Sequence, residues 1–148
     1  MGQSLMGQPA SHVVEIEVLA TDIDAYQHVN NSVYLSWLDR AAWSHSAQLG
    51  VPLERCLSMH RGMAAYRSEI DYVRAAVLGD RVFVGTWIVS TDHKLRVERR
   101  FEVRRAPQGE LLARARIDYV CINLDSGRAT RMPDLFRHAY VPTTASPA

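Results

Sequence analysis

One segment of the chain has the hydrophobic period of a helix, and segments with the pattern of strands surround it. Apolar side chains recur at steps of three and four between residues 32 and 49, on one helical face: Tyr34, Trp37, Leu38, Ala41, Ala42, His45 and Leu49. Asn30 or Asn31 can cap the start of this helix, and Gly50 followed by Pro52 ends it. The opposite face carries few charges, which predicts that the helix is enclosed on most sides.

The segments on either side of this helix have the composition of strands and are separated by turn-forming residues. Strands are predicted at 12–20, 63–73, 82–90, 95–105 and 111–124. The short links between the later strands favour antiparallel pairing. One helix with five strands predicts an α+β fold, in which a curved antiparallel sheet wraps around one long central helix.

The length of the chain fits a single domain. Its 148 residues are too few for two domains of ordinary size. We expect the domain at 12–140, with flexible tails of small and polar residues at 1–11 and 141–148. Pro133 is expected to start a short helical turn near the end of the domain.

Composition and charge exclude several classes of protein. Hydrophobic residues form 47% of the chain and charged residues 22%, which is typical of a soluble globular protein. The formal net charge is +1, which gives no electrostatic basis for binding nucleic acid or an anionic membrane. The chain shows neither a signal peptide nor a long apolar run, so we expect a cytoplasmic protein. Cys56 and Cys121 are then expected to be buried or free thiols.

Polar side chains gather directly before the predicted helix, from Asp22 to Asn31. The first N–H groups of a helix have no partner within it and carry a partial positive charge, so they can polarise a carbonyl oxygen. A carboxylate a few residues upstream can then lie beside the carbonyl carbon, as acyl transfer requires. Taken alone, Asp22 and Asn30 are better explained as helix caps than as catalytic residues. The set Asp22, Asp24 and His28 is only a weak metal-binding pattern.

This segment resembles the hotdog-fold acyl-CoA thioesterases, through the string Asp22-Ile-Asp24-Ala-Tyr-Gln-His28-Val-Asn-Asn31-Ser-Val-Tyr34. It is most similar to the group typified by 4-hydroxybenzoyl-CoA thioesterase. The HVNN-x-x-Y part also resembles the plant acyl-carrier-protein thioesterases. Downstream, residues 72–80 are similar to the family's second strand and its Gly-Asp turn, and the similarity extends over about 12–131.

The resemblance implies an enzyme that hydrolyses an acyl-CoA thioester to the free carboxylic acid and coenzyme A, with no cofactor and no metal. Asp24 corresponds to the catalytic carboxylate of the family, acting as nucleophile or as general base. The N–H of Asn31 corresponds to the donor that polarises the carbonyl. His28 matches a histidine of the plant enzymes and is expected to assist, whereas Tyr26 replaces their asparagine. The substrate lies between subunits in this fold, so a homodimer or homotetramer is expected.

The resemblance also implies residues that bind the substrate. Tyr34 and Trp37 on the helix are expected to do so, and Trp37 can line an acyl pocket. The family's contacts to the coenzyme A phosphates fall on the turn between the third and fourth strands, which here contains His93 and Lys94. Lys94 is the one certain cation of that turn, so other arginines are alternatives: Arg96, Arg128 and Arg131.

Two other functions fit part of the pattern. A hotdog-fold hydratase or dehydratase also holds an acyl thioester at this helix, but the spacing between Asp24 and His28 and the missing proline count against it. A non-catalytic acyl-binding module is the second alternative, and the intact Asp24 argues against it.

Overall fold

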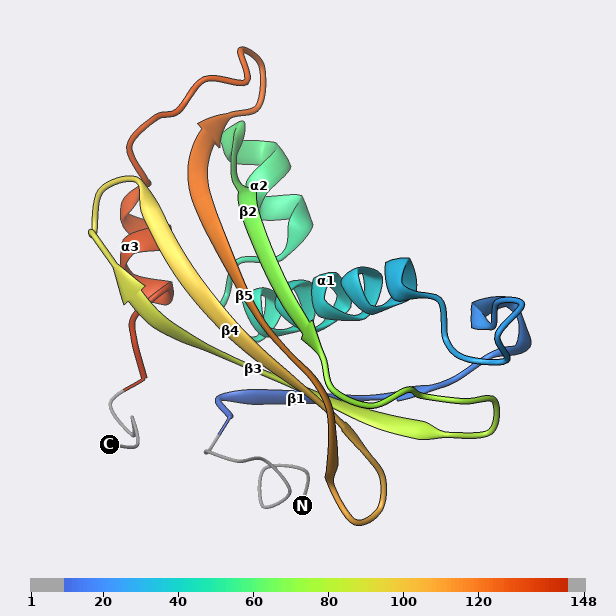
Figure 1. The fold of residues 1–148 in the computed structure, drawn as a ribbon. Coiled ribbons are helices and arrows are strands. Elements are labelled where there is room, and N and C mark those ends of the chain that lie inside the picture. Colours follow the sequence, from blue (N-terminus) through green and yellow to red (C-terminus); the bar gives the residue numbers. More distant parts are fainter. Residues whose placement is uncertain (1–9, 144–148) are drawn as a thin grey trace.

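The computed structural model describes residues 10–143, which form one curved sheet with a long helix inside the curve (Figure 1). The sheet is antiparallel throughout, and its strand order is β1-β3-β4-β5-β2. Its strands are β1 (His12–Glu17), β2 (Arg61–Tyr72), β3 (Arg81–Thr91), β4 (Arg96–Arg105) and β5 (Glu110–Asn123). The predicted α+β architecture is therefore confirmed.

The central helix α1 (Asn31–Gln48) begins and ends as its sequence predicts. The side chain of Asn30 caps it by accepting a hydrogen bond from the N–H of Ser32 at 2.9 Å. Gly50 follows it at φ +92°, a backbone conformation that glycine adopts without a steric penalty. The predicted apolar face is buried against the sheet, with Trp37, Leu38 and Phe101 in the main core.

The opposite face of α1 is not enclosed within one chain. Leu35 is 45% exposed and Trp43 is 41% exposed, although both are large and apolar. They lie eight residues apart with Asp39 between them, so they form one stripe along the helix. The chain's own strands therefore do not explain why this face of α1 carries so few charges.

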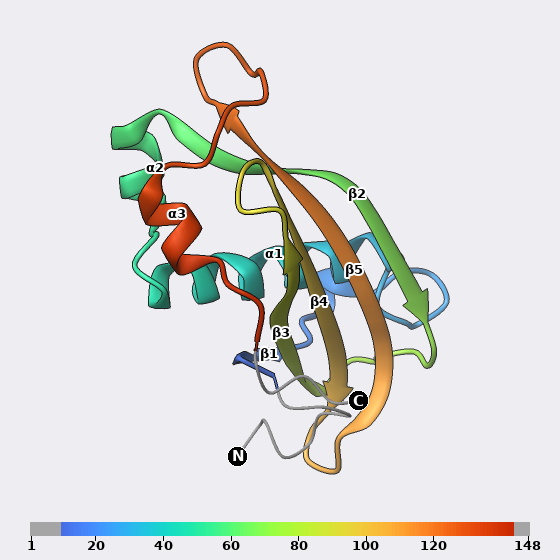
Figure 2. The same cartoon turned by 90° about the vertical axis from the view of Figure 1, so that its left-hand side faces the viewer.

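Two helices pack beside the end of α1 (Figure 2). The expected turn after Pro133 is the helix α3 (Asp134–Ala139). The helix α2 (Leu53–Met59) was not predicted, because its seven residues are too few to show a helical period. Both helices contribute to a second core cluster, which contains Cys56, Cys121 and Phe136.

Both cysteines are free and buried, as expected. Burial raises the pKa of the Cys121 thiol to about 11, which disfavours the reactive thiolate. Cys121 is thus a packing residue.

The first strand is shorter than the pattern predicts, and a 3₁₀ turn, η2 (Ala20–Asp22), follows it. The expected tails 1–11 and 141–148 lie mostly outside the described residues. Of their described parts, Ser11 donates its N–H to the carbonyl of Thr86 at 3.1 Å, and Thr143 donates to the carbonyl of Ile88 at 3.0 Å. Within residues 10–143, no helix is long and apolar enough to cross a membrane.

The loop between β2 and β3 holds the start of α1 in place. Ala76, which is fully buried, accepts a hydrogen bond from the N–H of Val29 at 2.9 Å. Its own N–H donates to the hydroxyl of Tyr34 at 3.1 Å. At the Gly-Asp turn of the same loop, the carboxylate of Asp80 accepts from the N–H of Val77 at 2.9 Å and pairs with Arg105. The sheet therefore positions the helix start through this loop.

We expect Tyr34→Phe to lower the free energy of unfolding by about 1–3 kcal/mol, because it leaves the buried N–H of Ala76 without an acceptor. Tyr72→Phe is the matched control. Its hydroxyl donates to the carbonyl of Asn31 at 3.2 Å in an exposed position, where water can replace it. Urea unfolding measures both variants, and equal losses would show that the Ala76 contact has no special importance.

Candidate active site

A compact loop places Asp24 directly before α1. Ile23 and Val29 pair as an isolated bridge, and within this bridge the N–H of Asp24 donates to the carbonyl of His28 at 3.0 Å. The N–H of Gln27 donates to the carbonyl of Asp24 at 3.0 Å, with Gln27 in the left-handed region at φ +64°. The backbone of the loop is thus closed on itself, which limits where the Asp24 carboxylate can lie.

The carboxylate of Asp24 has one occupied and one available oxygen. Its Oδ1 accepts a hydrogen bond from the N–H of Tyr26 at 2.9 Å. Among residues 10–143, no group donates to its Oδ2. The residue is half-buried, whereas His28 in the same loop is exposed. The second oxygen is therefore free to meet a substrate or a water molecule.

The first turn of α1 leaves one backbone donor for a ligand. The side chain of Asn30 accepts a hydrogen bond from the N–H of Ser32, and its carbonyl accepts one from the N–H of Val33 at 2.9 Å. No acceptor for the N–H of Asn31 exists in the described part of the chain. An unpaired N–H at a helix start is a good donor to a developing negative charge.

Asp22 and Asn30 have structural roles, as the simpler interpretation predicts. Asp22 accepts the N–H of Leu19 at 2.9 Å through its side chain, and the N–H of Asn30 at 2.9 Å through its carbonyl. The weak metal pattern of Asp22, Asp24 and His28 does not come together. Across residues 10–143, no group of three His, Cys, Asp or Glu side chains is placed to hold a metal ion.

The predicted substrate-binding residues lie in two separate places within the chain. Tyr34 and Trp37 pack against each other in the core, with ring centroids 5.0 Å apart. His93 and Lys94 are exposed on the turn between β3 and β4. That turn lies at the other end of the molecule from the loop before α1 (Figure 1). One chain therefore brings Asp24, His28 and Asn31 together but not His93 and Lys94.

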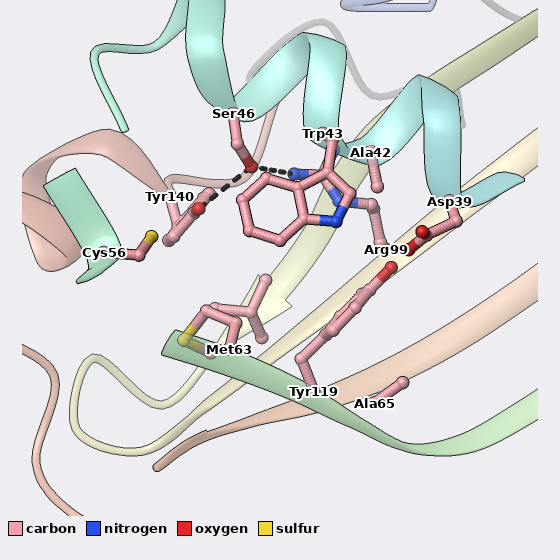
Figure 3. A pocket seen from close by; sticks show the side chains of 11 residues that line it. Asp39, Ala42, Trp43, Ser46, Cys56, Met63, Ala65, Arg99, Tyr119 and Tyr140 are labelled. Carbon is pink, nitrogen blue, oxygen red and sulfur yellow. Dashed lines mark hydrogen bonds between the residues drawn. The ribbon is translucent and has the colours of Figure 1, made fainter. Parts of the chain in front are cut away.

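A cavity that was not predicted lies between α1 and strands β2, β4 and β5, with a volume of about 110 Å³ (Figure 3). Its lining includes Arg99, which is 3% exposed. Arg99 occupies an inward position in the alternating pattern of β4, between Val97 and Phe101. The sequence could have indicated this residue, because the alternation of the strand places an arginine among the apolar side chains of its buried face.

His45, on the buried face of α1, contacts this arginine. The guanidinium has no acceptor atom, so the Nδ1 of His45 accepts from Nη1 of Arg99, at 2.7 Å. Burial, together with the charge of Arg99 and the neighbouring His12, lowers the pKa of His45 to about 3. His45 is therefore neutral at physiological pH and supports the charged guanidinium beside it.

His45 makes stability depend on pH. Its folded pKa of about 3 lies below the ordinary value of 6.5, so the unfolded chain binds more protons between these values. We expect the free energy of unfolding to fall as pH drops below about 6, by up to about 1.4 kcal/mol per pH unit from this group. His45→Asn keeps an acceptor for Arg99 but cannot titrate. It should therefore remove the contribution of His45 to the pH dependence of the free energy of unfolding.

Chemical denaturation at pH 7, 5 and 4 measures the difference between the two proteins. His138→Asn, an exposed change on α3, is the control for losing a histidine. A slope in His45→Asn as steep as in the unchanged protein would contradict a neutral buried His45.

The curved antiparallel sheet around one central helix is the architecture of the hotdog-fold thioesterases. The model of the thioesterase-like superfamily matches residues 18–140. The chain belongs to this superfamily. The predicted resemblance and class of enzyme are thereby confirmed.

Known proteins of this kind cover most of the chain. The long-chain acyl-CoA thioesterase FadM of Escherichia coli (strain K12) is 28% identical over 115 residues, which are 78% of this chain and 86% of FadM. A 1,4-dihydroxy-2-naphthoyl-CoA thioesterase from Synechocystis has a TM-score of 0.79 at 25% identity, covering 87% of this chain and 94% of the other. A thioesterase from Thermus thermophilus, complexed with coenzyme A and Zn, has a TM-score of 0.72 at 28% identity, covering 88% and 98%.

Proposed function

We propose that this protein hydrolyses acyl-CoA thioesters at the loop before α1. One observation carries the proposal: a half-buried carboxylate with a free oxygen, Asp24, precedes by seven residues a helix amide, that of Asn31, with no acceptor among residues 10–143. The similarity to FadM, and to a thioesterase complexed with coenzyme A, supports an acyl-CoA as the substrate.

The chemistry follows from these two groups. The thioester oxygen accepts the N–H of Asn31, which draws electrons from the carbonyl carbon and stabilises the oxyanion that forms there. One such donor is worth roughly 3 kcal/mol of barrier. The free oxygen of Asp24 either attacks this carbon, giving an anhydride that water hydrolyses, or removes a proton from the attacking water. Both routes break the carbon–sulfur bond and yield a carboxylic acid and coenzyme A.

His28 has an accessory role in this proposal. It is exposed on the Asp24 loop, and its carbonyl accepts the N–H of Asp24 at 3.0 Å. The imidazole ring of His28 therefore lies on the same closed loop as the proposed catalytic carboxylate of Asp24. From there it can orient water or deliver a proton to the leaving sulfur, while the carboxylate and the amide carry the main effect.

We expect Asp24→Asn to lower kcat at least about a hundredfold, because the amide is neither a good nucleophile nor a base. His28→Ala is the matched variant in the same loop, and we expect a smaller loss. Release of free thiol from acyl-CoAs with short, long and aromatic acyl groups measures turnover, and circular dichroism checks the fold.

Undiminished thiol release by Asp24→Asn would exclude Asp24 from the reaction. No thiol release from any acyl-CoA by the unchanged protein would favour a hydratase or an acyl-binding module.

We further propose that the working unit is at least a homodimer, in line with the resemblance. β2 is an edge strand of 12 residues, and the middle of it is exposed. Large apolar side chains are also exposed on it and on α1, among them Tyr66, Leu35 and Trp43. Surfaces of this kind are typical of interfaces between protein copies. A second copy would cover the stripe of α1 that the chain's own sheet leaves open.

We expect Leu35→Glu to separate the copies, because it places a charge in an apolar interface. Leu57→Glu on α2 is the control, since Leu57 is also exposed and apolar but lies outside this surface. Light scattering after gel filtration measures the mass of each. A monomeric unchanged protein, or equal effects of the two variants, would contradict an interface on α1.

A further inference from the structure

The cavity beside α1 has a polar inner end and an apolar wall (Figure 3). Trp43 and Ala65 belong to the apolar wall, and Arg99 is the cation of the lining. Three hydroxyl groups also line the cavity: those of Ser46, Tyr119 and Tyr140. The Oγ of Ser46 and the hydroxyl of Tyr140 are 2.9 Å apart. Nothing in the proposed hydrolysis uses this arrangement.

Arg99 has more donors than the protein supplies with acceptors. Its Nη1 donates to His45 at 2.7 Å and to the hydroxyl of Thr86 at 3.3 Å. Its Nη2 reaches the hydroxyl of Ser46 at 3.5 Å, which is a long hydrogen bond. A guanidinium has five N–H groups. Two of them, one on Nη2 and the one on Nε, thus have no acceptor among residues 10–143.

Arg99 also lacks a charge partner. Its three hydrogen-bond acceptors are neutral groups, and no carboxylate in the described range forms an ion pair with it. A buried, unpaired charge is costly in a protein interior. The remaining donors of a guanidinium match the two oxygens of a carboxylate, which binds in a bidentate manner and neutralises the charge.

The rest of the cavity suits the body of a small organic acid. Its volume of about 110 Å³ is comparable with the engineered void of about 150 Å³ that holds benzene. Trp43 offers an aromatic ring at the wall of the cavity (Figure 3). Burial raises the pKa of Tyr119 to about 12, so its hydroxyl stays protonated and can donate to an anion.

Asp39 is the acidic group of the lining, and it opposes an anion. It is exposed, in contrast to the buried Arg99, and no ion pair joins the two within the described residues. Its carboxyl group lies beside the hydroxyl end of Tyr119 (Figure 3). Its negative charge is therefore expected to weaken, but not to prevent, the binding of an anion on Arg99.

We propose that this cavity is a binding site for a small organic carboxylate, with the carboxylate on Arg99 and the apolar body against Trp43. The carboxylate is either that of a free acid or the distal end of an acyl group. Binding of a free acid does not depend on the proposed hydrolysis. The two proposals can therefore fail separately.

Titration calorimetry with benzoate, and with the neutral isostere benzamide, tests the site. We expect benzoate to bind at least about tenfold more tightly than benzamide, since hydrogen bonds to charged groups are the stronger ones. Arg99→Gln should abolish this preference. Asp39→Asn should tighten benzoate binding, because it removes the like charge.

A second variant, Ala65→Leu, tests the same cavity in case Arg99→Gln does not fold. Ala65 is an exposed residue of the lining, so a larger side chain there fills the cavity without touching the guanidinium. We expect it to lose benzoate binding while the thermal midpoint stays near that of the unchanged protein. Benzoate that fails to bind at millimolar concentration, or binds Ala65→Leu equally well, would overturn the proposal.

A second measurement distinguishes the two sources of the carboxylate. Hydrolysis of acyl-CoAs that end in a carboxylate is compared with that of equally long acyl-CoAs that end in a methyl group. A preference for the carboxylate that Arg99→Gln removes assigns the site to the substrate. Benzoate binding without such a preference assigns it to a free acid.

Discussion

The backbone of Ala76 is the point through which the sheet fixes the start of α1. Its carbonyl and its N–H bind Val29 and Tyr34, one on each side of the first residue of the helix. Ala76 is itself held in the loop that Asp80 and Arg105 tie to the sheet. Because both backbone groups of one buried residue are used, the helix start cannot shift without leaving a buried polar group unpaired. The position of the Asn31 amide depends on this contact.

The proposed active site and the proposed carboxylate site lie toward opposite ends of α1. The Asp24 loop precedes Asn31, and the Arg99 cavity reaches Ser46 near the other end. Fifteen residues of helix separate these positions, about 22 Å at the usual rise. An antiparallel pair of α1 helices in a dimer would bring the start of one beside the cavity of the other.

Most elements could be predicted because their patterns are long and periodic. α1 shows its apolar face at helical spacing over 18 residues, and β4 alternates between buried and less buried positions from Arg96 to Val103. α2 has seven residues and buries only Cys56, so no period distinguished it. Arg99 was missed for another reason: its inward position in β4 is visible, but whether it meets a carboxylate or neutral groups depends on residues far away in the chain.

The sequence by itself determined the class of fold and the loop where Asp24 and the helix start meet, because these features are local. Hydrophobic period, caps and turns act over a few neighbouring residues, and the spacing of Asp24 to Asn31 is part of the chain itself. Only the tertiary structure decided which donors stay unpaired, since that follows from contacts between segments distant in sequence. The N–H of Asn31 stays open because no other segment within residues 10–143 supplies an acceptor for it. Arg99 is surrounded by neutral partners because α1 and β3 pack against β4.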